Sequence, residues 1–159
     1  MKRVATALAI LGIAALAILA GPRVPVPVSA MEVPEVPVEV VRAVQNMARN
    51  LPSDMFQMSP AALAQRLQAG QELFLLDVRR PDEFAAGRIE GAVNVPVHEI
   101  AEDLHLLPED PETFIVVYCR SGVRSMFATA ALLMLGYKTV YNMQGGIIAW
   151  EAAGFSVVR

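Results

Sequence analysis

The residue types that could do chemistry gather around Cys119, the single cysteine of the chain. Cys119 opens a short segment, Cys-Arg-Ser-Gly-Val-Arg, which ends at Arg124 and directly follows a run of apolar residues. Where a helix starts after such a run, several backbone N–H groups are free to bind an anion. The helix dipole and the two arginines favour the thiolate, which is the nucleophilic form of cysteine. Gly122 lets the backbone curl around the sulfur, so nucleophilic catalysis is favoured over the alternative, a buried structural cysteine.

Other polar residues are weaker candidates. Asp77 and Arg79 follow another apolar run, and we interpret them as supporting residues near the site. A structural salt bridge from Arg79 to Asp77 or Glu83 is favoured over a catalytic role. His98 and His105 have no cysteine or acid at metal-ligand spacing, so both are interpreted as surface residues. One cysteine excludes an intrachain disulfide and a multi-cysteine zinc site, and no metal or cofactor is predicted.

The elements that must position Cys119 alternate between strands and helices. Apolar runs predict strands over residues 73–78, 92–95, 114–118 and 139–142. Helices are predicted over residues 60–70, 99–106 and 122–135, with a helical turn at 81–84 and a last helix containing Trp150. We therefore expect a three-layer α/β fold, with a mainly parallel central sheet and helices on both faces. In such sheets ligands bind beyond the carboxyl ends of the strands, which is where Cys119 falls.

Three ordered motifs resemble the signatures of the rhodanese (thiosulfate sulfurtransferase) family. Residues 77–96, Asp-Val-Arg-Arg-Pro-Asp-Glu-Phe-Ala-Ala-Gly-Arg-Ile-Glu-Gly-Ala-Val-Asn-Val-Pro, are similar to its N-terminal signature. The segment from Cys119 to Ser125 is similar to its active-site loop. The C-terminal signature is matched by Leu135-Gly136-Tyr137, Gly145-Gly146-Ile147 and Trp150. Three motifs in order are far more specific than any one of them.

The resemblance covers about residues 55–157 and departs from the family at two positions. Arg88 stands where the family usually has histidine, and Glu90 where it usually has proline. Because both positions lie away from the cysteine loop in the sequence, we expect altered surface chemistry rather than lost activity.

The resemblance implies a single-domain rhodanese-like enzyme that moves a sulfane sulfur. The Cys119 thiolate would attack thiosulfate or a similar small anionic donor, and sulfite would leave. The resulting persulfide would pass its sulfur to a thiophilic acceptor, which is cyanide, a thiol or a protein thiol. The implied substrate-binding residues are Arg120, Ser121, Gly122, Val123 and Arg124. Their backbone amides would stabilise the anionic sulfur, and the two arginines would attract and orient the donor.

Two other function classes stay open at this point. Phosphatases and arsenate reductases of related fold also place a cysteine and an arginine around an oxyanion. Their loops resemble Cys-x5-Arg, whereas Cys119 to Arg124 is Cys-x4-Arg, a tighter cradle that suits sulfur. The second class is a non-enzymatic module of the cell envelope that carries sulfur or binds a partner. Retention of Cys119 beside two arginines argues against an inactive domain, but not against a protein acceptor.

Composition bounds the remaining possibilities. The chain has 159 residues, of which 55% are hydrophobic and 18% charged, so we expect one domain rather than disorder throughout. Of the 13 basic residues, 3 lie within residues 1–30, which contain no acid. The remainder therefore holds 10 basic residues against 16 acidic ones, a net charge of −6. A domain this acidic is a poor general nucleic-acid binder, because phosphate contacts need an excess of Lys and Arg.

Residues 1–30 predict an export signal. Lys2 and Arg3 precede an uncharged run over residues 4–20, and Val28-Ser29-Ala30 offers the small residues that signal peptidase prefers. The alternative is an uncleaved membrane anchor through residues 4–20, since this run of 17 residues is somewhat short of the ~20 that span a bilayer comfortably. We expect a periplasmic or secreted protein, or, in the alternative, a domain anchored to the membrane outside the cytoplasm.

A spacer is predicted between this segment and the domain. Residues 31–54 continue a proline- and valine-rich stretch, which favours an extended chain. A short amphipathic helix is predicted near residues 38–50, packed on the domain rather than lying at a membrane surface. The rhodanese-like domain then occupies residues 55–159.

Overall fold

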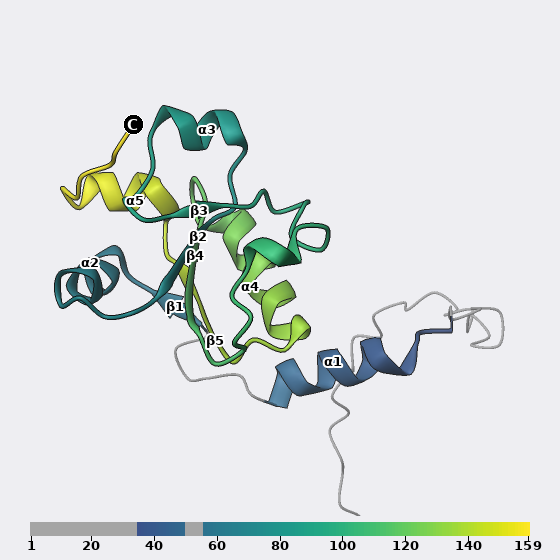
Figure 1. The fold of residues 1–159 in the computed structure, drawn as a ribbon. Helices are drawn as coiled ribbons and strands as arrows, with labels where there is room; N and C mark the ends of the chain where they lie inside the picture. The colour runs from purple at the N-terminus through teal and green to yellow at the C-terminus, as the bar shows by residue number, and fades with distance from the viewer. Residues whose placement is uncertain (1–34, 50–55) are drawn as a thin grey trace, which may run out of the picture. The chain divides into compact units, whose positions relative to one another are not determined.

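A computed structural model of the chain describes residues 35–49 and 56–159. The predicted signal or anchor, residues 1–30, and much of the spacer lie outside the described residues. Within the described ranges, five parallel strands form one sheet in the order β1-β5-β4-β2-β3 (Figure 1). The strands are Gln57–Met58 (β1), Phe74–Asp77 (β2), Val93–Asn94 (β3), Phe114–Tyr118 (β4) and Thr139–Met143 (β5).

The central strand β4 is buried on both faces of the sheet. Val116 pairs with Leu75 of β2 on one side and with Tyr141 of β5 on the other. Residues 115–118 have no measurable exposure to solvent. A continuous apolar run is the expected composition for a parallel strand covered on both faces, and it ends at Cys119.

Helices cover the two faces of this sheet, as Figure 1 shows. The helices are α1 (Val38–Arg49), α2 (Pro60–Gln68), α3 (Pro81–Ala86), α4 (Val123–Leu135) and α5 (Gly146–Ala152). On one face, Ala128 and Leu132 of α4 pack with strand residues such as Ile115 and Val117 in one buried cluster. The opposite face is covered by α2 and α5, whose residues pack with Val116 and Tyr118. The predicted three-layer α/β fold with a parallel sheet is therefore confirmed.

Two local predictions differ from the structure. Strand β1 is not among the predicted strands, because Gln57–Met58 is a two-residue edge strand and too short to show a period. The predicted helix over residues 99–106 is wrong, since the segment forms turns and a short 3₁₀ helix, η2 (Leu104–Leu106). Within this segment only Ile100 is buried, and Leu104 and Leu106 are exposed, so the segment buries no continuous apolar stripe of the kind that stabilises an α-helix.

The predicted amphipathic helix is present as α1, which contacts α4. This contact with the domain is loose. None of the residues of α1 is fully buried, and several of its valines stay exposed, including Val40 and Val44. Among the described residues, no helix has the length and apolar character needed to cross a membrane.

Candidate active site

Cys119 lies at the carboxyl end of β4, between the strand and the start of α4. Its Sγ accepts a hydrogen bond from the backbone N–H of Gly122 at 3.2 Å. Gly122 has a φ of 91°, and a Cβ at this position would lie 3.1 Å from the backbone nitrogen of Gly145. The loop therefore needs glycine at position 122 for its conformation as well as for space. Of the residues predicted for the loop, Ser121, Gly122 and Arg124 interact with the sulfur. Arg120 and Val123 are exposed beside it.

The start of α5 supports the same loop from the other side. The backbone N–H of Ile147 donates to the Cys119 carbonyl oxygen at 2.8 Å, and that of Ile148 donates to the Arg120 carbonyl oxygen at 3.2 Å. A Cβ on Gly146 would lie 2.4 Å from the same Cys119 oxygen. The Gly145-Gly146 pair thus permits a close backbone approach that fixes the position of the cysteine.

Hydrogen bonds stabilise the thiolate form of Cys119. Burial by itself would raise the pKa of the thiol, because it disfavours the charged form. Hydrogen bonds from the Ser125 hydroxyl and from the backbone amides of Ser125, Ser121 and Gly122 outweigh this effect, so the pKa lies below its ordinary value. A lowered thiol pKa agrees with the sequence prediction. The main cause of the lowering is hydrogen bonds donated to the sulfur, rather than the charge of the arginines.

Ser125 and Asn142 form a buried polar pair behind the sulfur. The sequence placed Ser125 at the end of the active-site loop without a role, and Asn142 was not predicted. The Ser125 Oγ lies 3.4 Å from the Cys119 Sγ and 2.6 Å from the Asn142 Oδ1. The Asn142 Nδ2 in turn donates to the Gln57 Oε1 at 3.0 Å. Because a hydroxyl has one proton, Ser125 shares it between the sulfur and the amide oxygen. The signal in the sequence was a lone asparagine close to the end of an apolar strand.

Arg124 is held at the mouth of the site by an acidic partner. Its guanidinium makes a bidentate ion pair with Glu83 of α3, with N···O distances of 2.8 and 2.9 Å. The Arg124 hydrogen bond, opposed in part by burial, lowers the pKa of Glu83 to about 2. The pKa of Arg124 is raised, first by Glu83 and further by the charge of Cys119. Arg124 therefore lies near the sulfur, but part of its charge is neutralised by Glu83.

A surface pocket of about 430 Å³ is lined by Arg80, Glu83, Arg120 and Arg124. Three cations and one anion therefore surround it. Arg80 and Asp82 make an exposed ion pair at its edge, at 2.7 Å. The composition of this pocket suits a small anion rather than an apolar ligand.

Asp77 and Arg79 form the predicted salt bridge. It is buried, with 2.6 Å between the Arg79 Nη2 and the Asp77 Oδ2. The same Nη2 donates to the carbonyl oxygen of Gly87 at 2.6 Å, and Asn94 donates to the backbone carbonyls of both residues of the pair. These bonds join β2, β3 and the end of α3, so the pair stabilises the packing of these three elements. Neither residue of the pair makes a hydrogen bond to the cysteine sulfur.

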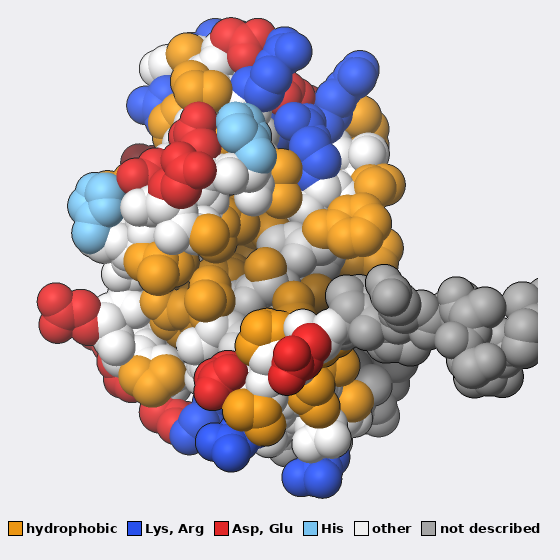
Figure 2. Space-filling view, turned by 90° about the vertical axis from the view of Figure 1, so that its right-hand side faces the viewer, with side chains coloured by type: hydrophobic (Ala, Val, Ile, Leu, Met, Phe, Trp, Pro, Cys, Tyr) orange, Lys and Arg blue, Asp and Glu red, His pale blue; other side chains and the backbone are white. Residues whose placement is uncertain are grey.

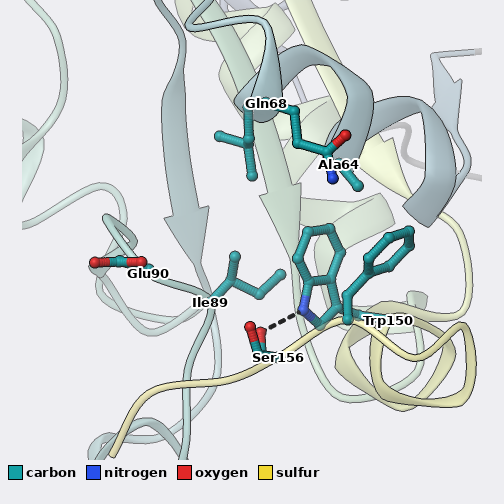
Figure 3. A pocket seen from close by; sticks show the side chains of 8 residues that line it. Ala64, Gln68, Ile89, Glu90, Trp150 and Ser156 are labelled. Atoms are coloured by element: carbon teal, nitrogen blue, oxygen red, sulfur yellow. Dashed lines mark hydrogen bonds between the residues drawn. The ribbon is translucent and has the colours of Figure 1, made fainter.

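A second pocket, of about 380 Å³, lies between α2 and α5 (Figure 3). Its lining is mostly apolar and contains neither a cysteine nor a basic residue. Trp150 lies on one wall, where its Nε1 donates to the Ser156 carbonyl oxygen at 2.9 Å, as the dashed line in Figure 3 marks. Glu90, one of the two departures from the family signature, lies on another wall. None of the predicted site residues lines this pocket.

Comparison with known proteins agrees with this geometry. The family model for the rhodanese-like domain matches residues 59–153. The chain belongs to the rhodanese-like family. A sulfurtransferase of Allochromatium vinosum is 40% identical over 102 residues, which cover 64% of this chain and 94% of that protein. A putative sulfurtransferase of Bacillus subtilis is 43% identical over 95 residues, covering 60% of this chain and 89% of that protein.

Solved structures of rhodanese proteins superpose on this chain. The rhodanese-related protein of Thermoplasma volcanium superposes with a TM-score of 0.57 at 32% identity, covering 64% of this chain and 96% of that one. A thiosulfate sulfurtransferase of Pseudomonas aeruginosa gives a TM-score of 0.61 at 29% identity, covering 78% of this chain and 23% of that one. The rhodanese-like fold is thereby shown, and the relatives support a transferase that handles sulfur.

Proposed function

We propose that the protein is a sulfurtransferase that carries sulfane sulfur as a persulfide on Cys119. The observation that carries this proposal is the environment of the Cys119 Sγ, which accepts hydrogen bonds from Gly122 and Ser125. The lowered thiol pKa increases the fraction of the nucleophilic thiolate relative to an ordinary cysteine. The sulfurtransferase relatives support the same reaction class.

The first half-reaction loads the enzyme. The Cys119 thiolate attacks the outer sulfur of thiosulfate, a new S–S bond forms, and the bond between the two thiosulfate sulfur atoms breaks. Sulfite leaves with the electron pair of that bond. The terminal sulfur of the persulfide keeps the negative charge, which the amides of residues 120–124 are placed to stabilise. Arg120 and Arg124 orient the sulfonate oxygens of the donor.

The second half-reaction unloads it. An acceptor such as cyanide attacks the terminal sulfur, the persulfide S–S bond breaks, and the Cys119 thiolate is restored. The products are thiocyanate, or a persulfide when the acceptor is a thiol. This is covalent catalysis in two steps, and kinetics with thiosulfate and cyanide are expected to follow a ping-pong scheme.

Steady-state assay of wild type and Cys119→Ser tests the proposal. The variant should lose thiocyanate formation while keeping its fold, because a serine oxygen cannot hold a persulfide. Residual activity above a few per cent of wild type would remove Cys119 as the nucleophile. Hydrolysis of p-nitrophenyl phosphate by wild type, with no thiocyanate formed, would instead support the phosphatase class. Failure in both assays would favour a non-enzymatic carrier or binding module.

We also propose that the domain acts outside the cytoplasm, after export through residues 1–30. Lys2 and Arg3, the apolar run of residues 4–20 and Val28-Ser29-Ala30 support this. N-terminal sequencing of protein recovered from cell fractions tests it. A start at Met31 in the soluble exported fraction is the expected result. An intact N-terminus in the membrane fraction would establish an anchor instead, and recovery from the cytosol with Met1 or Lys2 intact would overturn the proposal.

A further inference from the structure

Exposed apolar side chains lie beside the cysteine loop on two different elements. We call this set the apolar collar, and its members are Val123, Met126 and Phe127 of α4 and Ile148 of α5. Their exposed fractions run from 49% for Ile148 to 70% for Phe127. Positions 123, 126 and 127 share one face of α4, because residues three and four apart are neighbours on a helix.

Backbone contacts place the collar at the site. Val123 opens α4 directly after Gly122, whose N–H donates to the cysteine sulfur. Ile148 comes from α5, but its N–H donates to the carbonyl oxygen of Arg120 inside the loop. The collar therefore reaches the cysteine loop from two sides. On the face shown in Figure 2, hydrophobic side chains gather directly beneath a group of Lys and Arg side chains near the top of the view.

A small anionic donor does not explain the collar. Sulfonate oxygens bind to N–H groups and cations, and apolar side chains add nothing to that recognition. The core side of α4 is already formed by other residues, Ala128 and Leu132 among them, so the collar is not needed for the fold. Contiguous exposed apolar side chains typically mark contacts with another macromolecule.

Charge and burial describe the partner that fits. The chain beyond residue 30 is acidic, with a net charge of −6, whereas the pocket at the site holds Arg80, Arg120 and Arg124 against Glu83. An acidic surface on a partner is therefore complementary in charge to this pocket, whereas the rest of the acidic domain repels it. Cys119 itself is only 1% exposed. A macromolecule can bring a reacting group to it only on a narrow protruding segment.

We propose that the apolar collar docks a second protein that presents a reactive cysteine on a short flexible segment with apolar and acidic flanks. This proposal rests on the proposed sulfurtransferase function and specifies its acceptor. The partner's thiolate attacks the terminal sulfur of the Cys119 persulfide, the bond from that sulfur to the Cys119 Sγ breaks, and the Cys119 thiolate leaves. A persulfide forms on the partner, and the exchange needs no outside oxidant or reductant.

Two synthetic peptides and the full-length, thiosulfate-loaded protein test the docking. One peptide carries a single cysteine flanked by leucines and glutamates, and the other has lysines in place of the glutamates. The variant Phe127→Ser removes the most exposed collar side chain. Leu135→Ser is its matched control, since Leu135 is 48% exposed at the opposite end of the same helix. Ile148→Ser repeats the test from α5, so that a folding defect in one variant does not decide the result.

Wild type should transfer sulfur to the acidic peptide at least about tenfold faster than to the basic one. Phe127→Ser and Ile148→Ser should each lower kcat/KM for the acidic peptide by about tenfold, while Leu135→Ser stays within about twofold of wild type. Phe127→Ser and Leu135→Ser should keep wild-type activity toward cyanide. A wild type that forms thiocyanate but does not distinguish the peptides, or equal losses in Phe127→Ser and Leu135→Ser, would overturn the docking alone. A wild type that thiosulfate cannot load would overturn the proposed function, and the docking with it.

Discussion

Removal of the Ser125 hydroxyl should slow the chemistry of Cys119 without removing the nucleophile. The Ser125 Oγ lies 3.4 Å from the Cys119 Sγ, and its hydrogen bond is one of the interactions that lower the pKa of the thiol. Ser125→Ala keeps the backbone amide that also donates to the sulfur. The thiol pKa should therefore rise, and the fraction of thiolate at neutral pH should fall.

The size of the effect follows from the geometry. A hydrogen bond to a charged group contributes about 1.5–3 kcal/mol. The Ser125 proton is shared with the Asn142 Oδ1, which lies only 2.6 Å away, so the lower end of this range applies. About 1.4 kcal/mol is a factor of ten in an equilibrium. Below the pKa of the thiol, Ser125→Ala should therefore reduce the thiolate population, and the rate of alkylation, about tenfold.

Iodoacetamide alkylation measured against pH tests this prediction. The midpoint of the profile should move to higher pH in Ser125→Ala and stay in place in the control Ser121→Ala, which removes an exposed hydroxyl and keeps the amide. Asn142→Ala removes the competing acceptor, so its midpoint should move to lower pH. An unchanged profile in Ser125→Ala, or shifts of the same sign in Ser125→Ala and Asn142→Ala, would refute the shared proton.

Three other predictions concern the residues around the loop. Glu83→Gln should lower the free energy of unfolding near neutral pH. The difference from wild type should vanish as the pH falls from about 4.5 towards 2, because the folded-state pKa of Glu83 is about 2. If urea titrations gave an equal difference at every pH, the ion pair with Arg124 would not be its source. Asp77→Leu leaves Arg79 charged and unpaired in the interior and should cost about 3–5 kcal/mol of unfolding free energy, whereas a loss under 1 kcal/mol in the same titrations would contradict the bracing role. Gly146→Ala places a Cβ against the Cys119 carbonyl oxygen and should reduce thiosulfate:cyanide activity at least tenfold, and wild-type activity would contradict the close approach of α5.

The fold was predictable from the sequence where local patterns determine structure. The run over residues 114–118 becomes β4 within the same bounds, since a strand buried on both faces needs a continuous apolar sequence. The edge strand β1 carries no such pattern, because its two residues are placed by pairing with β5. The segment over residues 99–106 shows the opposite case, in which a suggestive sequence forms turns, because it buries Ile100 but leaves Leu104 and Leu106 exposed.

The candidate site likewise has a part that the sequence predicts and a part that it does not. The place of Cys119 follows from the end of one strand and the start of one helix, both local features. The partners of the site are distant in sequence: Glu83 lies 41 residues from Arg124, and Asn142 lies 17 residues from Ser125. Only the packing of α3 and β5 against the loop brings these pairs together. Long-range polar pairs of this kind have no periodic signature.

The most direct test of sulfur transfer through Cys119 is the intact mass of the protein after incubation with thiosulfate. Wild type should gain one sulfur atom, which peptide mapping should locate on Cys119, and release one sulfite for each sulfur gained. Cyanide should then remove the added mass and yield one thiocyanate. Cys119→Ser should gain nothing under the same conditions. An unmodified wild-type protein, or equal sulfur gain in Cys119→Ser, would contradict a persulfide on Cys119.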